Sequence, residues 1–555
     1  MNATVSLDIS EVKSHLMTNK FIIPTAQSYQ SFESNSKGFH TYGPLGVTLR
    51  NKLINLWRKL FITSNVFEID TPLLQSKEVL TNSGHVGKFT DLVVSNGKDT
   101  VRADHLVKDY CEKNNIKLTK PIDDMVQDEL LTLVKQYAMI ENSENATIAP
   151  KNLMFGFGDL YLRPEIAQGM FTEFDQFYNS GVSLPFGLAQ VGKSYRNEIS
   201  PQPFIRLREF TQAEVEYFFD PNDESHPLFE SVKHLTIPLF TQELQIADSN
   251  LAALYSIENS VTNKIIVNEI MGYFLGTIYK FAKKLGLSDD SIRFRQHLPN
   301  ELAHYAKQCW DLEIKLANGG WLECVGCAHR GSFDLQNHNI RGQNVIKSYA
   351  TKLTKFKINL NSGESKDTAK EFYTLFKNKM YDSREQVEAD PNYKTFCNNT
   401  FITEYVQVVE SNVFPNVIEP SMGIDRMIFA VANNLLKKRT DDNNRIVFNL
   451  PLEFVPYEIA VYALSNKDNL INYVKTKLLH LNNDFSVFYD FSGTSIGKRY
   501  VRSDEIGVGL TITVDFQTLN DDTVTLRYSS DGHQDRLHIS EIVGIIKKLL
   551  ENNKK

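Results

Sequence analysis

Charged and aromatic side chains alternate along a stretch of the chain that two prolines interrupt. Pro201 and Pro203 disfavour regular structure, so the segment around them is predicted to form the loop of a β-hairpin. Strand side chains point alternately to two faces. One face of the second arm would then hold Arg206, Arg208, Phe210, Gln212, Glu214 and Glu216. Arg196 and Glu198 share a face of the first arm, and a loop centred near Gln202 would place Arg196 opposite Arg208.

The order of these side chains suggests what they bind. Guanidinium groups near the loop are suited to phosphate oxygens. The ring of Phe210 is suited to a nucleobase, and the carboxylates at the far end to an ammonium group. The face therefore predicts a site for a nucleoside triphosphate beside an amino acid. A surface hairpin with cross-strand ion pairs is the alternative.

Three segments of the chain resemble a known protein family. Residues 195–201, Tyr-Arg-Asn-Glu-Ile-Ser-Pro, with residues 208–214, Arg-Glu-Phe-Thr-Gln-Ala-Glu, resemble motif 2 of the class II aminoacyl-tRNA synthetases. The sequence of these two segments is specifically similar to that of the homodimeric glycyl-tRNA synthetases of eukaryotes, archaea and some bacteria. Residues 416–426, Asn-Val-Ile-Glu-Pro-Ser-Met-Gly-Ile-Asp-Arg, resemble motif 3, with Asp425 where many class II motifs have glycine. Motif 2 is expected at about 184–217 and motif 3 at about 413–437.

A long helix is predicted to precede these motifs. Leu49, Leu53, Leu56 and Leu60 fall on one stripe, and a short strand over residues 66–70 follows, ending before Pro72. Residues 44–72 resemble motif 1, which implies that this element forms a homodimer interface. An ordinary amphipathic core helix is the alternative.

Two other segments match the family wording. Residues 161–169, Tyr-Leu-Arg-Pro-Glu-Ile-Ala-Gln-Gly, contain Glu165 and have Ile166 where the family usually has threonine. Residues 321–330, Trp-Leu-Glu-Cys-Val-Gly-Cys-Ala-His-Arg, are expected to form a central strand that points Glu323 into the site.

The cysteines of that strand have a spacing that also occurs in zinc sites. Cys324 and Cys327 have His329 close by, but only His338 is available as a further ligand. A structural zinc site normally needs a second ligand pair, so zinc is the less favoured interpretation.

The resemblance implies a role for each candidate residue. The residues expected to be catalytic, by contacting the α-phosphate and the reacting carboxylate, are Arg196 and Arg330. ATP binding is expected of Arg196, Glu198, Arg208, Phe210, Glu323 and Arg426. Glycine binding is expected of Glu165, Glu214, Glu419 and Ser421. Mg²⁺ is expected at Glu323 or Glu410.

The C-terminal part changes pattern to alternating strands and helices, which predicts a small mixed α/β domain over residues 456–555. It resembles the anticodon-binding domain of class IIa synthetases. Lys498, Arg499 and Arg502 form a basic cluster suited to tRNA phosphates. A solvated helix start is the alternative.

The whole chain is expected to have an α+β fold, an antiparallel sheet flanked by helices. Residues 1–20 form an N-terminal extension and residues 21–455 the catalytic domain. Insertions are expected at about 86–150, 221–290 and 340–405, the second of them mostly helical.

Composition is that of a globular protein without membrane spans. Apolar residues make up 42% and charged residues 23% of the 555 residues, and the net charge of −7 requires any nucleic-acid contact to use local basic patches. Five cysteines, and an N-terminus without a secretory or transit pattern, predict a cytoplasmic protein. An organellar form from an alternative start remains open.

The resemblance implies that the chain activates glycine with ATP and transfers it to tRNA(Gly). One alternative keeps the class but changes the amino acid to threonine, proline, serine or histidine. A threonyl enzyme would need a zinc with Cys and His ligands, which the sequence does not assemble. The other alternative is a polymerase accessory subunit without activity, and the intact motif residues argue against it.

Overall fold

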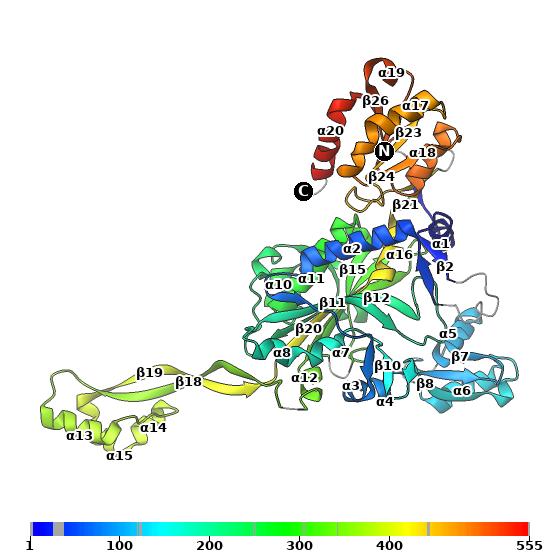
Figure 1. Ribbon diagram of the computed structural model, residues 1–555. Helices are drawn as coiled ribbons and strands as arrows, with labels where there is room; N and C mark the ends of the chain where they lie inside the picture. Colours follow the sequence, from blue (N-terminus) through cyan, green and yellow to red (C-terminus); the bar gives the residue numbers. More distant parts are fainter. Residues whose placement is uncertain are drawn as a thin grey trace.

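The computed structural model describes residues 4–25, 38–118, 120, 122, 125–247, 249, 251–303, 306–340, 342–440 and 445–552, and leaves aside the side chains of residues 349–352, 407–410 and 552. Figure 1 shows a central body around one large sheet, a smaller C-terminal domain above it, and a long hairpin arm that projects to the left. No helix among the described residues is both long and apolar enough to cross a bilayer.

The central sheet has nine strands in the order β14-β13-β15-β16-β17-β20-β12-β11-β4. All neighbours pair antiparallel except β11 with β4 and β13 with β15, which confirms the predicted antiparallel-rich sheet. The strands are β4 (Val66–Glu68), β11 (Phe186–Tyr195), β12 (Glu209–Phe219), β13 (Thr236–Phe240), β14 (Ala253–Ser256), β15 (Ile292–Gln296), β16 (Gln308–Lys315), β17 (Trp321–Gly331) and β20 (Asn416–Gly423).

The hairpin predicted around the two prolines is formed by β11 and β12. Tyr195 pairs with Glu209, and the backbone N–H of Arg196 donates to the carbonyl of Arg208 at 2.9 Å. This register centres the loop on Gln202, as the sequence predicted. The loop is closed by an isolated bridge between Gln202 and Arg206, and Phe204 adopts a positive φ of 68°.

Helices cover the sheet, and the first long one is α2 (Pro44–Phe61). It starts after Gly43 with a proline in its first turn and buries the predicted stripe, including Leu49, Leu53 and Leu56. It packs against α11 (Glu269–Lys284) and α16 (Ile424–Leu435), with Phe61 and Phe274 stacked at 6.5 Å. The burial of this stripe holds β4 beside β11.

Residues 74–179 form small layers beside the hairpin (Figure 1). Two three-stranded sheets occur here, in the orders β5-β10-β9 and β7-β6-β8. Their strands are β5 (Leu74–Ser76), β6 (Thr90–Ser95), β7 (Thr100–Arg102), β8 (Thr147–Asn152), β9 (Gly156–Phe157) and β10 (Leu160–Leu162). The helices are α3 (Lys77–Asn82), α4 (His85–Lys88), α5 (Ala103–Lys113), α6 (Gln127–Gln136), α7 (Ala167–Thr172) and α8 (Phe174–Asn179).

Residues 221–290 contain two strands in addition to the helices that the sequence suggested. Besides α9 (Gln242–Ile246), α10 (Ile257–Thr262) and α11, they supply strands β13 and β14 at one edge of the central sheet. Four of the five residues of β13 are buried. A short apolar run of this kind does not distinguish a buried strand from a helix by its periodicity.

Residues 346–413 form the projecting arm. Strands β18 (Ile346–Leu360) and β19 (Thr400–Val413) pair antiparallel along their length. Helices α13 (Lys366–Phe376), α14 (Arg384–Ala389) and α15 (Pro391–Phe396) pack at its tip around a small core that includes Phe372 and Phe376. Between the arm and β17 lies α12 (Phe333–Asn337).

The C-terminal domain has a five-stranded mixed sheet in the order β24-β23-β25-β26-β27, which confirms the predicted mixed α/β domain. Its strands are β23 (Ile459–Ala463), β24 (Val487–Asp490), β25 (Leu510–Val514), β26 (Thr523–Tyr528) and β27 (Gln534–His538). Its helices are α17 (Asp468–Tyr473), α18 (Ile496–Glu505), α19 (Thr518–Asp521) and α20 (Ile539–Asn552). A separate hydrophobic core lies within it.

The N-terminal residues lie at the junction of the two bodies. Strand β1 (Thr4–Ser6) pairs with β21 (Leu436–Arg439), which pairs with β22 (Arg445–Phe448). In α1 (Ile9–Thr18), the His15 ring contacts the carbonyl of Glu505 at 2.7 Å. Arg445 forms an ion pair with Asp504 at 3.4 Å. Strands β2 (Ile22–Pro24) and β3 (His40–Tyr42) then lead to α2.

We predict that Gly46→Ala destabilises the catalytic body by about 3 kcal/mol. A Cβ at this position of α2 would lie 1.9 Å from the carbonyl oxygen of Phe21, so the helix would have to move off β2. Gly544→Ala is the control, because a Cβ in that turn of α20 meets nothing within 4 Å. Thermal and denaturant unfolding measure both variants, and equal stabilities would contradict the packing described for α2.

Candidate active site

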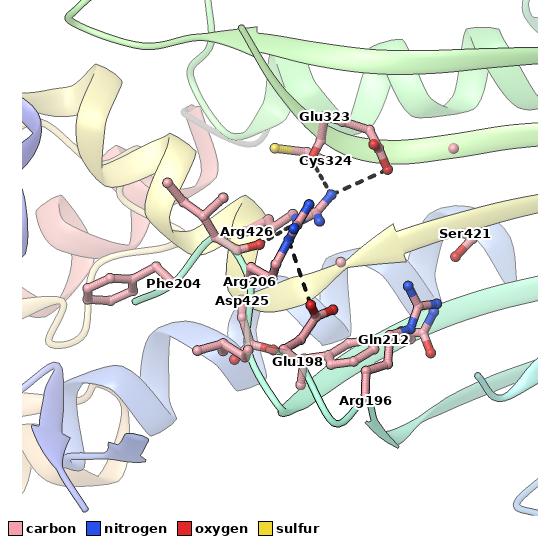
Figure 2. Close-up of a pocket in the computed structure, with 15 residues that line it drawn as sticks. Arg196, Glu198, Phe204, Arg206, Gln212, Glu323, Cys324, Ser421, Asp425 and Arg426 are labelled. Carbon is pink, nitrogen blue, oxygen red and sulfur yellow. Dashed lines mark hydrogen bonds and ion pairs between the residues drawn. The ribbon is translucent and has the colours of Figure 1, made fainter. Parts of the chain in front are cut away.

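A cavity opens on the central sheet between the β11–β12 loop, β17, β20 and the start of α16 (Figure 2). Its walls bring together residues that are far apart in the sequence, including Arg196, Glu198, Arg206, Phe210, Gln212, Glu323, Ser421 and Arg426. Six of these eight were predicted site residues, and they come from four different strands or strand ends and one helix.

The loop end of the cavity is positively charged. The Arg196 guanidinium lies 5.3 Å from the centre of the Phe210 ring and the same distance from Phe89, and its Nε donates to the carbonyl of Pro164. Arg426, in the first turn of α16, donates from Nε to the carbonyl of Ile205 at 2.8 Å. These contacts hold Arg196 beside Phe210, the aromatic ring that the sequence singled out for a base, and hold Arg426 on the wall of the same cavity.

Two carboxylates accompany these cations. Glu323 forms an ion pair with Arg426 at 3.3 Å, and Glu198 forms one with Arg206 at 3.9 Å (Figure 2). Burial raises the pKa of Glu198, although Arg206 and Arg196 oppose the shift. Glu323 is more than half exposed and is the carboxylate of the cavity wall that is most open to a ligand.

Arg208 departs from its predicted place. It does not line the cavity; its Nε donates to the carbonyl of Glu198 at 3.0 Å, and its Cγ would lie 3.0 Å from a Cβ at Gly38. Strand β12 begins only at Glu209, so the alternation that the sequence suggested does not extend to this residue. Arg206 is the loop arginine that faces the cavity.

Carboxylates gather at the other end of the same face. Glu214 of β12 accepts hydrogen bonds from Ser421 Oγ at 2.5 Å and from Gln212 Nε2 at 2.6 Å. Glu165 accepts from Gln168 at 2.8 Å and lies 3.4 Å from the ring of His85. Together with Glu419, the predicted amine-binding carboxylates therefore surround one small region.

Arg330 lies among these carboxylates. It is 4% exposed, and it donates from Nη1 to Glu419 at 2.5 Å and from Nε and Nη2 to the two oxygens of Asp334. Asp334 also accepts from Gln168 at 3.3 Å, which ties this pair to Glu165. The guanidinium of Arg330 thus binds two carboxylates of the protein, and its predicted contact with the substrate stays a prediction.

The carboxyl groups differ in how strongly they resist ionisation. Burial, together with the charges of Glu419 and Glu165, raises the pKa of Glu214 from 4.5 to about 8. Burial also raises the pKa of Glu419 and raises that of Glu216 well above the ordinary value. For Glu165 burial acts in the same direction, but His85 and Arg330 outweigh it and lower the pKa. The site therefore holds protons that a bound cation would displace.

Two acidic residues of the site were missed or left without a role in the sequence. Glu216 is fully buried, and neither of its carboxylate oxygens has a hydrogen-bond partner among the described residues. Asp425 accepts from the Tyr42 hydroxyl at 2.5 Å and from the backbone N–H of Thr211 at 2.6 Å. It thus ties the start of α16 to β12 and β3, a connection that a single sequence does not reveal.

The possible zinc pair is not assembled. Cys324 and Cys327 are both buried in β17, the first with its thiol near the carbonyl of Leu322 and the second near the sulfur of Met271. His329 accepts from the backbone of Gly331. Neither cysteine belongs to a candidate metal group among the described residues. His297, Cys309 and Asp311, which the sequence did not single out, form such a group instead.

The remaining predicted residues lie away from the cavity or outside the description. The side chain of Glu410 is among those left aside. In α18, Lys498 and Arg502 are exposed, and Arg502 pairs with Asp490 at 3.2 Å. Arg499 is 1% exposed and donates to the carbonyls of Thr494, Asp490 and Leu464. Its guanidinium therefore holds the domain together and is not available to a nucleic acid on the surface.

Comparison with known families matches both parts of the chain. Residues 157–435 match the model described as tRNA synthetase class II core domain (G, H, P, S and T), and residues 458–549 match the anticodon binding domain. The first match covers about half of the chain and includes most of the cavity. The fold and the site thus define a class II tRNA synthetase.

Full-length relatives narrow the assignment. The chain is 35% identical to glycine–tRNA ligase 2 of Saccharomyces cerevisiae over 98% of this chain and 96% of that protein. It is 36% identical to glycine–tRNA ligase of Methanocaldococcus jannaschii over 94% of this chain and 96% of that protein. The chain belongs to the glycine–tRNA ligase family, which removes the alternatives of another amino acid and of an accessory subunit.

We predict that Glu214→Gln raises stability increasingly between pH 5 and pH 9. In the folded chain this carboxyl keeps its proton up to about pH 8, whereas its ordinary pKa is 4.5. The folded state therefore binds more protons in this window, and its stability falls as the pH rises. An amide removes that loss, which is on the order of 4 kcal/mol between pH 5 and pH 9. Thermal unfolding without substrates measures it.

The control for this prediction is Glu371→Gln on the exposed surface of α13, which should change stability equally little at every pH. A Glu214→Gln variant whose melting temperature differs from that of the wild type by the same amount at pH 5 and pH 9 would contradict the raised pKa.

Proposed function

We infer that this chain is a glycine–tRNA ligase, which joins glycine to ATP as glycyl-adenylate and then transfers the glycyl group to tRNA(Gly). The observation that carries this conclusion is the single sheet face on which guanidinium groups, an aromatic ring and buried carboxylates follow one another. The full-length similarity to glycine–tRNA ligases supports it. ATP is the nucleotide that a class II core uses.

We assign the nucleotide to the loop end of the cavity. The adenine would stack on Phe210, with Arg426 on its other side. Arg196 would contact the α-phosphate, and Glu198 the base or ribose. The outer phosphates, which the sequence assigned to Arg208, we assign to Arg206, because Arg206 faces the cavity and Arg208 does not.

We assign the glycine amine to the carboxylate end. Glu165, Glu214 and Glu419 would surround the ammonium group, and Ser421 would lie against the α-carbon, where a larger side chain would clash. Ser421 is held by its 2.5 Å hydrogen bond to Glu214. Arg330 acts through Glu419 and Asp334: it fixes these carboxylates and offsets part of their charge.

The first reaction needs positioning and charge neutralisation, and no side-chain nucleophile. A carboxylate oxygen of glycine forms a bond to the α-phosphorus, while the bond from that phosphorus to the bridging oxygen breaks and pyrophosphate leaves. Arg196 lies between the cation-rich and carboxylate-rich ends, so it can neutralise the charge on both reacting groups. The 3′ hydroxyl of tRNA(Gly) then attacks the glycyl carbonyl, and AMP leaves.

Mg²⁺ would add positive charge on the phosphates. Glu323 fits this role because its carboxylate is more than half exposed at the cavity wall and forms an ion pair with Arg426. Glu410 remains a second proposed ligand on the strength of the sequence.

We further propose a homodimer that forms through motif 1. Strand β4 is the edge strand of the central sheet, and apolar side chains near it and on the adjoining three-stranded sheet are exposed. They are Phe67, Leu73, Leu74, Phe157 and Leu160. Such a concentration of exposed apolar side chains is typical of an interaction surface.

Two further assignments complete the proposal. Lys498 and Arg502 on α18 are the proposed tRNA contacts, now without Arg499. A cytoplasmic location is supported by five free cysteines.

We predict that Arg196→Gln lowers glycine-dependent ATP–pyrophosphate exchange by about 100-fold or more, because the charge beside the reacting groups is lost. The far-ultraviolet circular dichroism and the melting temperature should stay close to those of the wild type. The control is Arg384→Gln, at an exposed arginine of the arm that forms an ion pair with Glu388. Near-normal exchange by a folded Arg196→Gln protein would refute the assignment.

A further inference from the structure

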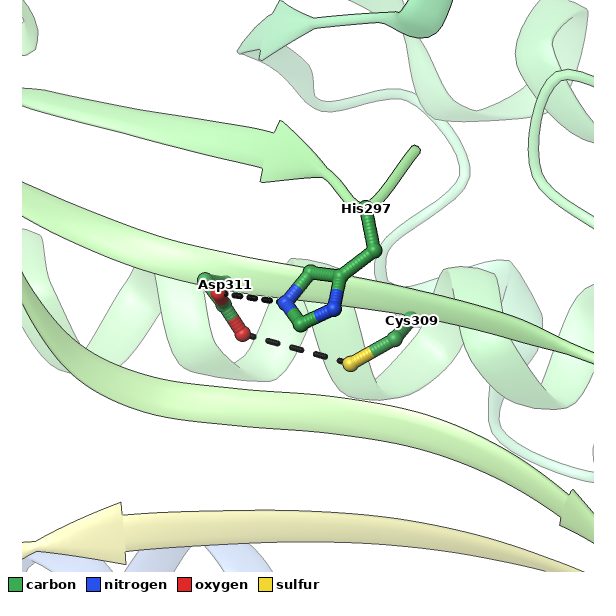
Figure 3. A group of neighbouring side chains, drawn as sticks. All are labelled: His297, Cys309 and Asp311. Atoms are coloured by element: carbon green, nitrogen blue, oxygen red, sulfur yellow. Dashed lines mark hydrogen bonds and ion pairs between the residues drawn. The ribbon is translucent and has the colours of Figure 1, made fainter. Parts of the chain in front are cut away.

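Three side chains with different metal-ligating atoms meet at the neighbouring strands β15 and β16 (Figure 3). His297 directly follows β15, and Cys309 and Asp311 lie two residues apart on β16. His297 Nε2 lies 2.6 Å from Asp311 Oδ2, and Cys309 Sγ lies 3.9 Å from Asp311 Oδ1. All three ligand atoms lie within 4.8 Å of one another.

The backbone holds these ligands in place. The N–H of His297 donates to the carbonyl of Cys309 at 3.0 Å, so the two strands fix the imidazole beside the thiol. Cys309 and Asp311 share one face of β16 because strand side chains alternate. Asp311 is 7% exposed and Cys309 and His297 are partly buried, so a bound ion would remain reachable from solvent.

The group lies on the same face of the sheet as the proposed glycine site. Asp311 pairs across the strands with Gly326, Gly326 with Ser421, and Ser421 with Glu214. In the next row, Cys309 pairs with Ala328, which pairs with Glu419. Two strand spacings, about 10 Å, separate the group from Ser421, and only small side chains stand between them.

Gly326 leaves the route between the two places open. It lines the cavity, and a Cβ built on it would lie 3.6 Å from Asp311 Oδ1. The Asp311 carboxylate is therefore at the margin of the cavity.

We propose that His297, Cys309 and Asp311 bind a zinc-class divalent cation. A sulfur, a nitrogen and an oxygen ligand suit Zn²⁺, whereas Mg²⁺ and Ca²⁺ select oxygen ligands alone. The atoms need to move by only small side-chain rotations, since ligand atoms around tetrahedral zinc lie about 3–4 Å apart. Three protein ligands leave a fourth position for water or a substrate oxygen, and Gly326 gives that position access to the cavity. No hydrogen bond among the described residues joins the thiol to the imidazole, so a thiol–imidazole nucleophile pair is not formed.

The test is metal binding by the full chain without ATP, glycine or tRNA, so its outcome is independent of the proposed ligase activity. We expect about one zinc per chain by mass spectrometry of the metal content, and, after exchange to Co²⁺, a near-ultraviolet thiolate-to-cobalt charge-transfer band. Cys309→Ser should remove the band, and His297→Asn should weaken zinc binding at least about 100-fold, the upper end of losses from outer-shell changes. Circular dichroism checks that both variants are folded.

Cys397→Ser is the control, because Cys397 is the exposed cysteine of the arm, far along the chain from the group. It should keep both the zinc and the band. Absence of stoichiometric zinc or cobalt in the loaded wild type would overturn the proposal. A charge-transfer band that persists in folded Cys309→Ser, or that disappears in Cys397→Ser, would overturn it as well.

Discussion

The burial of several carboxyl groups in one small region, together with the repulsion between their charges, is the constraint on which the rest of the site depends. Glu214, Glu216 and Glu419 are buried on adjoining strands, and burial raises the pKa of each. One buried guanidinium, that of Arg330, offsets only part of this charge and is shared with Asp334. The raised pKa values favour the protonated form of these carboxyl groups. In the proposed glycine site, the ammonium group would replace these protons, and the buried carboxyl groups would thereby favour a ligand with a positive charge.

The surrounding structure places these carboxyl groups on the same sheet face as the guanidinium groups of the cavity. The long β11–β12 hairpin presents carboxylates at one end and guanidinium groups at the other, and in the proposed reaction the two reacting anions would meet between them. Asp425 fixes the start of α16 against β12 through the backbone N–H of Thr211 and against β3 through the Tyr42 hydroxyl. These contacts set the position of Arg426 relative to Phe210. Helix α2 belongs to the motif 1 segment that is proposed as the dimer interface. It packs against α11 and α16, and so connects this segment with the start of motif 3. Stability and catalysis are thus connected through a few packed elements.

Local sequence patterns predicted the parts of this arrangement that depend on residues close together in the sequence. Prolines and period-two alternation located the hairpin and its centre at Gln202, and the apolar stripe located α2. Arg206 and Arg208 were not separated, because the backbone leaves strand geometry before Glu209 and alternation no longer applies. The burial of Arg499 depends on three carbonyls of other segments. His297, Cys309 and Asp311 meet only because β15 and β16 are neighbours in the sheet, and the unpartnered state of Glu216 is likewise a property of long-range packing. The resemblance of the sequence to a known family identified the candidate site residues, whereas the contacts between them are seen only in the structure.

In the proposed glycine site, a bound ammonium group takes the place of protons on the buried carboxyl groups. Calorimetric titration with glycyl-sulfamoyl adenosine, an unreactive analogue of the adenylate, in two buffers of different ionisation enthalpy at pH 7.5 measures the protons exchanged on binding. With the pKa of Glu214 at about 8 in the free protein, this carboxyl is about three quarters protonated at pH 7.5, so we predict a net release of at most about three quarters of a proton per site. The acetyl-sulfamoyl analogue, which lacks the amine, should release none. Proton uptake, or equal exchange with both analogues, would contradict the account.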